Sequence, residues 1–78
     1  MKSTRYFQAT RERPDRRGIG LEWIERVIAS PAREIVQQDG RIRLWAPIAE
    51  MDGRFLRVIL LADRETVHNA FFDRSFRL

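Results

Sequence analysis

The sequence predicts an α+β fold, with one principal helix packed on an antiparallel sheet of three or four strands. Apolar residues recur with a helical period over residues 21–29, and the period changes to two after Pro31. Two Asp-Gly pairs, Asp39-Gly40 and Asp52-Gly53, stand where hairpin turns would join successive strands. A helical segment followed by a run of strands is typical of the α+β class.

The longest apolar run, at residues 55–62, predicts the central strand of the sheet. Both of its side-chain parities are mostly apolar, which indicates a strand covered on both faces. The other strands are expected at residues 33–38, 41–46 and 66–72, so the sheet should be a meander. Pro47 is expected to mark an edge, a bulge or the end of the regular ladder.

The principal helix is predicted at residues 21–29, where Leu21, Ile24 and Ile28 follow one another at steps of three and four. Glu22 in the first turn suits the positive end of the helix dipole, and the Ser30-Pro31 pair ends the helix. So short a helix would not be stable alone in water, so it must pack on the sheet. Residues 4–9 are compatible with a short strand or with the start of a short N-terminal helix.

The length and the composition of the chain restrict the class of protein. Seventy-eight residues indicate a single domain spanning 1–78, which buries only about 60% of its unfolded surface. The absence of cysteine and the single histidine exclude disulfides, thiolate chemistry and a zinc site of sulfur and imidazole, and no cofactor is expected. No apolar run approaches the ~20 residues of a membrane span, and no apolar signal segment opens the chain. A cytoplasmic protein is therefore expected.

The basic residues are almost all arginine. Fourteen of the fifteen are arginine, and the formal net charge is +4. Arginine is preferred where a planar fork must bind phosphate or carboxylate, or must stack on a base. A genome rich in G and C would produce the same bias without a physical cause. The net charge favours polyanionic partners at low salt.

Strand parity divides the sheet into an inner and an outer face. The residues expected under the helix are Ile42, Leu44, Leu56, Val58 and Leu60. The opposite face would then carry Arg41, Arg43, Trp45 and Arg57. Arginines that meet phosphates, with an indole on which a base stacks, suit single-stranded RNA. Because Phe55, Ile59 and Leu61 share this face with Trp45, an apolar patch that binds another protein or a second copy of the chain is the favoured interpretation, and it is compatible with RNA binding.

Few residues offer catalytic chemistry. His68 is a candidate general acid or base, although a lone histidine on a short strand is more often structural. Neither parity of residues 66–72 is purely apolar, so the buried face of the last strand stays open. Asp15 and Asp73 are expected in salt bridges and turn capping. No nucleophile elbow, phosphate-binding glycine loop or metal-ligand spacing is present.

The layout resembles a known family over residues 5–76. The likeness rests on Arg17-Gly18-Ile19, on Trp23-Ile24-Glu25 with Pro31, and on Leu56-Arg57-Val58-Ile59. These motifs resemble a bacterial family of small domains of unknown function, related to the BrnT and RelE-like toxins of toxin–antitoxin pairs. The resemblance implies a RelE-like fold, a metal-independent ribonuclease and a small antitoxin as protein partner. The opening segment departs from this family, with Arg11 and Arg13 where relatives often carry a histidine.

Such a toxin cleaves RNA by attack of the 2′-hydroxyl on the adjacent phosphate, which needs a base, an acid and cations. The candidate catalytic residues are His68, Arg57 and Arg74, and the candidate RNA-binding residues are Arg41, Arg43, Trp45 and Arg13. The alternative hypothesis is a non-catalytic protein–protein interaction module. A metabolic enzyme is a third and weaker hypothesis, because no substrate-pocket motif is present.

Overall fold

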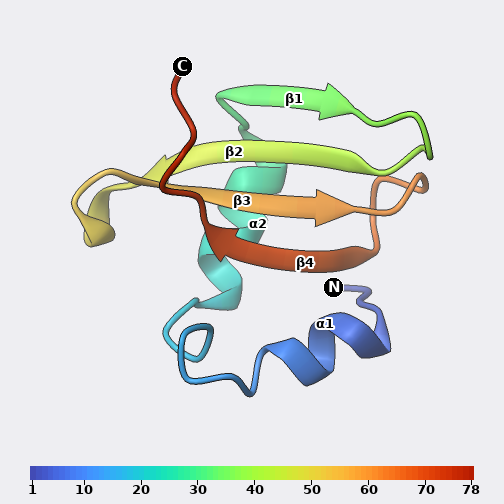
Figure 1. Cartoon of the computed structure of the whole chain (residues 1–78), viewed down its shortest axis with the longest axis horizontal. Coiled ribbons are helices and arrows are strands. Elements are labelled where there is room, and N and C mark those ends of the chain that lie inside the picture. The colour runs from blue at the N-terminus through green and yellow to red at the C-terminus, as the bar shows by residue number, and fades with distance from the viewer.

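The chain forms two helices and then a four-stranded sheet (Figure 1). The computed structural model describes all residues from 1 to 78. The elements in chain order are α1 (Arg5–Thr10), α2 (Leu21–Ala29), β1 (Arg33–Val36), β2 (Ile42–Ile48), the single 3-10 turn η1 (Ala49–Met51), β3 (Arg54–Leu60) and β4 (Val67–Phe72). In Figure 1, α2 lies behind the sheet and α1 lies beside the edge strand β4. The expected α+β fold, with a principal and a short N-terminal helix, is therefore confirmed.

The sheet is an antiparallel meander of order β1-β2-β3-β4. The apolar run at 55–62 supplies β3, an inner strand, as predicted. At the β1–β2 turn, Gly40 has a φ of 89°, a conformation that glycine adopts without steric cost. The Asp39 carboxylate accepts a hydrogen bond from the Arg41 backbone N–H at 3.0 Å. The turn chemistry of the sequence thus sets the strand connections.

Strand β2 runs further than the sequence indicates. It continues through Pro47 to Ile48, and Pro47 pairs with Phe55 of β3. On the other side of β2, pairing with β1 reaches only as far as Trp45. Because no strand lies there beside Pro47, a residue without an N–H is tolerated inside this strand.

The core lies between the sheet and α2. The core residues alternate along β2 and β3, as period two requires, and α2 adds Ile24 and Val27 at 1% and 0% exposure. The sheet residues of this core are Ile42, Leu44, Ala46, Ile48, Leu56, Val58, Leu60, Val67 and Ala70. The predicted inner set is therefore confirmed.

The N-terminal residues cover the β4 edge. The Val67 N–H donates to the Lys2 carbonyl at 2.8 Å, and the Thr4 N–H donates to the Val67 carbonyl at 3.0 Å. Thr4 then caps α1, because its Oγ1 accepts from the Phe7 N–H at 3.1 Å. Residues 4–9, left open by the sequence, are thus an N-cap and a helix. The contacts shield a sheet edge that would otherwise be free to pair with other chains.

A β-bulge in β4 explains why strand parity was ambiguous there. Leu60 pairs with Val67 and Ile59 with Asn69, which leaves His68 without an opposite residue on β3. The extra residue brings both Val67 and Ala70 to the core face, at 0% and 4% exposure. A strict period of two cannot describe such a strand.

Candidate nucleic-acid interface

A row of alternating cationic and aromatic side chains crosses the outer face of the sheet. Register places Arg33 opposite Trp45, Trp45 opposite Arg57, and Arg57 opposite Phe71. The Arg57 guanidinium carbon lies 5.4 Å from the Trp45 ring centre and 5.2 Å from that of Phe71. Arg16, from the loop after α1, lies 5.2 Å from the Phe71 ring centre. We call these five residues the cation–aromatic row. Arg57 is attracted to the rings of Trp45 and Phe71, and Arg16 is attracted to that of Phe71.

Arg16 also closes the rest of the β4 edge. Its Nη1 donates to the Asn69 side-chain oxygen at 2.8 Å and to the Ala70 carbonyl at 3.4 Å. The side chain is only 16% exposed, so it lies against the sheet rather than in solvent. Arg16 therefore lies at the end of the row and donates a hydrogen bond to the Ala70 carbonyl, which has no strand beside it.

Trp45 is buried, at 4% exposure, which corrects the expectation that its indole offers an open surface to a base. The Phe76 ring stacks on it, with centroids 4.7 Å apart and planes 15° apart. The indole N–H donates to Asp73 Oδ2 at 3.0 Å. The covering segment 73–78 follows β4 and passes in front of β3 and β2 in Figure 1. Strand parity identifies the face of a residue but cannot reveal that another segment covers it.

Asp73 fixes the middle of the row. Arg57 Nη1 lies 3.5 Å from Asp73 Oδ2, and the two side chains are 20% and 10% exposed. Burial alone would raise the pKa of Asp73, but hydrogen bonds from Trp45 and Ser75 and the charge of Arg57 outweigh it and hold the pKa below its ordinary value. The Arg57 Nε–H is buried without an acceptor. Arg57 is thus already paired within the fold, and Asp73 bridges and caps as the sequence suggested.

A cleft of about 580 Å³ adjoins one end of the row. It lies where segment 73–78 leaves β4, near the start of β3 and the loop after α1. Its lining residues are Asp15, Arg16, Arg54, Phe55, Phe71, Phe72, Asp73, Arg74, Phe76 and Arg77. We call it the arginine cleft, because four arginines face only two carboxylates in it. Of these arginines, only Arg74 was among the sequence candidates.

The other RNA-binding candidates lie outside the cleft. Arg41 is exposed, with its Nε 3.9 Å from Asp39 Oδ2. Arg43 is half-buried and pairs in register with Ile59. Arg13 is exposed in the loop between the two helices. No hollow in the structure is lined by more than one of these three arginines.

His68 has its own surroundings, apart from the cleft. Its Nδ1 lies 3.1 Å from Thr4 Oγ1, and its ring stacks on Tyr6 with centroids 4.9 Å apart. Burial, and then the positive charge of Arg41, lower the pKa of His68 from its ordinary value of 6.5. No contact joins His68 to Arg57 or Arg74, so the three catalytic candidates do not form one site.

The lowered pKa predicts a pH dependence of stability. As pH falls through about 6.5, the histidine takes up a proton in the unfolded chain before it does so in the folded chain. Protonation therefore favours the unfolded state as pH falls. We expect the free energy of unfolding to fall between about pH 7.5 and about pH 5.5, a window above the carboxylate titrations. Urea denaturation across this window should show the fall, and His68→Gln should flatten it. The same slope in both proteins would contradict the assignment.

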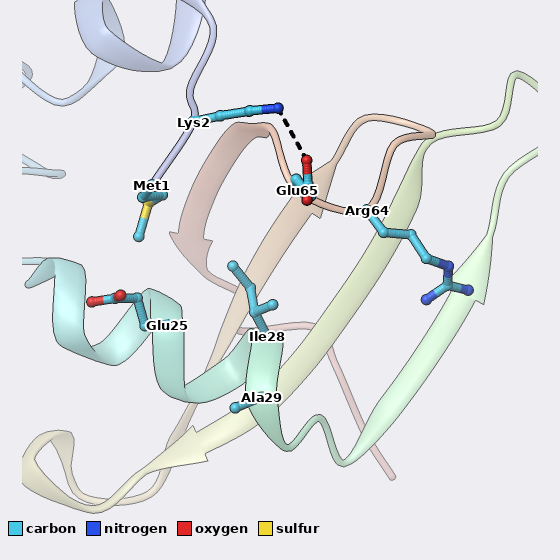
Figure 2. A pocket seen from close by; sticks show the side chains of 7 residues that line it. All are labelled: Met1, Lys2, Glu25, Ile28, Ala29, Arg64 and Glu65. Atoms are coloured by element: carbon cyan, nitrogen blue, oxygen red, sulfur yellow. Dashed lines mark hydrogen bonds and ion pairs between the residues drawn. The ribbon is translucent and has the colours of Figure 1, made fainter.

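A second hollow lies on the helix side of the sheet, with a volume of about 450 Å³. Figure 2 shows it between the N-terminal residues, α2 and the turn after β3. Lys2 pairs with Glu65 at 3.1 Å, and the Arg64 guanidinium points away, to pair with Glu34 of β1 at 2.7 Å. Its cations are neutralised within the fold, so it is less suited than the arginine cleft to hold a polyanion.

Fold and site define a small α+β protein with a four-stranded meander and an arginine–aromatic outer face. Comparison with family models, with curated proteins and with solved structures finds no match in any of the three. The longest helix has nine residues, and no helix has the length and apolar character needed to span a membrane.

Proposed function

We propose that this protein binds single-stranded RNA through the arginine cleft. One observation carries the proposal: Arg54, Arg74 and Arg77 line the same hollow, and none is within ion-pair distance of a carboxylate. By contrast, Arg26 and Arg64 each pair with a glutamate. Gathered cations that the fold does not neutralise raise the local concentration of phosphates.

The rings in the cleft favour a single strand over a duplex. Phe55 lines it, and its ring centroid lies 4.9 Å from that of Phe76. Unpaired bases stack on aromatic side chains and on guanidinium planes, whereas paired bases are not available for stacking. Phosphate contacts and base contacts would thus lie side by side.

Binding is favoured over cleavage because of how the titratable groups are placed. His68 does not line the cleft, and Asp73 is already engaged by Trp45, Ser75 and Arg57. Cleavage without a metal needs a base and an acid that both reach the reacting phosphate. The sequence resemblance to RelE-like toxins supports RNA as the polyanion and a small antitoxin as a protein partner.

The test is a salt titration of single-stranded RNA binding, measured by fluorescence anisotropy. We expect the variant Arg54→Ala/Arg74→Ala/Arg77→Ala to bind about tenfold more weakly at low salt, with a log–log salt slope lower by about 2, since each lost phosphate contact removes about 0.7. The matched control is Arg5→Ala/Arg26→Ala/Arg64→Ala, which loses the same formal charge outside the cleft. Equal weakening in the two variants would mean that net charge, rather than the cleft, binds RNA.

The toxin resemblance adds a measurement in cells. Production of the chain should slow bacterial growth, and the cleft variant should relieve this effect more than the control variant. If the purified protein does not bind RNA and its production leaves growth unchanged, the proposal is wrong.

The protein–protein interaction module then remains, and one observation favours it. The edge strand β1 leaves Ile35 and Val36 exposed, at 42% and 58%. The Gln37 N–H donates to the Arg41 carbonyl, so by antiparallel alternation the backbone groups of Glu34 and Val36 point away from β2. A free edge with apolar side chains is suited to pairing with a strand of a partner.

A further inference from the structure

Phe76 packs on an indole and lies close to a guanidinium, and we call the place that its ring occupies the slot. The Phe76 ring lies nearly parallel to the Trp45 indole, with ring centroids 4.7 Å apart. The guanidinium carbon of Arg33, another residue of the row, lies 5.7 Å from the Phe76 ring centre. Trp45 is in turn contacted by Arg57. The cation–aromatic row thus continues through a ring supplied by segment 73–78. An aromatic ring that stacks on tryptophan and contacts an arginine has the surroundings that a stacked nucleobase adopts.

The segment that carries this ring is weakly attached to the sheet. Its last backbone hydrogen bond to a strand is from the Asp73 N–H to the Phe55 carbonyl, at 2.9 Å. Beyond it, the only backbone bond is a long one of 3.4 Å from the Phe76 N–H back to Asp73. Ser75 and Arg77 bond only within the segment. Residues 74–78 are therefore held to the sheet mainly by the Phe76 ring.

We propose that Phe76 occupies a nucleobase site and that a base of single-stranded RNA displaces it to stack on Trp45. This inference rests on the proposed RNA binding and adds the position of a base. The occupant is a nucleotide rather than an apolar peptide, because Arg33 has no carboxylate partner and the arginine cleft adjoins the slot. A nucleotide whose base stacks on Trp45 would place its phosphates among these arginines, whereas an apolar peptide would leave the arginines without an anionic partner.

The displaced ring competes with the ligand, so removing it should tighten binding. When only a fraction of the population is competent to bind, the apparent dissociation constant equals the intrinsic one divided by that fraction. We expect Phe76→Ala to bind single-stranded RNA about fivefold more tightly than the parent protein. An oligomer of equal length with abasic sites should show no gain, because it offers phosphates without rings.

Trp45 can report the same event by its fluorescence. In a Trp23→Phe background it is the only tryptophan. Phe76→Ala should shift its emission to the red as the indole becomes exposed, and bound RNA should quench it. Unchanged or weaker RNA binding by Phe76→Ala would overturn the inference, since the ring would then be structural or would itself contact the RNA.

Three further outcomes separate this inference from the proposed function. If the parent protein binds RNA through the arginine cleft but Phe76→Ala gains nothing, only the base site is wrong. If neither protein binds RNA at any salt concentration, both proposals fail. If Phe76→Ala binds a free peptide of sequence DRSFRL but no RNA, the slot is a peptide site, which also overturns the inference.

Discussion

Replacing Leu44 with alanine should lower the free energy of unfolding by about 2–4 kcal/mol. Leu44 is 2% exposed and pairs in register with Val58, which is fully buried beneath α2. Truncation removes buried methyl groups and leaves a cavity that the close-packed neighbours fill only in part. Single domains are stable by only about 5–15 kcal/mol, so this is a large share of the total. Val58→Ala should act in the same direction.

Urea denaturation followed by circular dichroism measures this loss. The matched control is Leu21→Ala, the same truncation on α2 at a residue that is 39% exposed. We expect the control to lose clearly less stability than Leu44→Ala, because truncating a partly exposed side chain leaves no enclosed cavity. Similar losses at the two leucines would show that the core is not where the sheet and α2 place it.

Replacing Asp73 with alanine should cost about 1–3 kcal/mol, the usual penalty for a buried group left without its partner. Two donors lose one acceptor: the Trp45 indole N–H at 3.0 Å and the Arg57 guanidinium at 3.5 Å. The Arg57 Nε–H already lacks an acceptor, so the remaining charge would be poorly satisfied. The Ser75 hydroxyl would also lose its bond to Asp73.

Asp15→Ala is the matched control for this prediction. Its carboxylate also lies 3.5 Å from an arginine, Arg16, but its side chain is 71% exposed. Exposed ion pairs contribute about 0–1 kcal/mol, so the control should be nearly as stable as the parent. Adding Arg57→Met to Asp73→Ala should restore part of the loss, because no unpaired charge then stays buried. Equal stability of the two aspartate variants would contradict the bridging role of Asp73.

The sequence by itself determined the order of α2 and the four strands, the turn at Asp39-Gly40 and the inner face of the sheet. Leu44 and Val58 were assigned to the core correctly because alternation along a strand follows from backbone geometry alone. The turn at Asp39-Gly40 was readable because glycine accepts its positive φ at little cost. These properties are local, so a single stretch of sequence contains them.

Only the tertiary structure decided the surroundings of the functional candidates. Trp45 is covered by Phe76, and Arg57 is paired with Asp73, because a segment without periodicity folds back across the sheet. His68 faces Thr4 and Tyr6 because one unpaired residue shifts the register of β4. No spacing in the sequence encodes these contacts.

The arginine cleft depends on the tertiary structure in the same way. Arg16 comes from a loop near the start of the chain, Arg54 begins β3, and Arg74 and Arg77 follow β4. The sequence shows an arginine-rich composition, but composition does not tell which of the arginines bind a ligand. The fold selects among them by neutralising some with carboxylates and gathering others in one hollow, since Coulomb interactions depend on distance in space rather than along the chain.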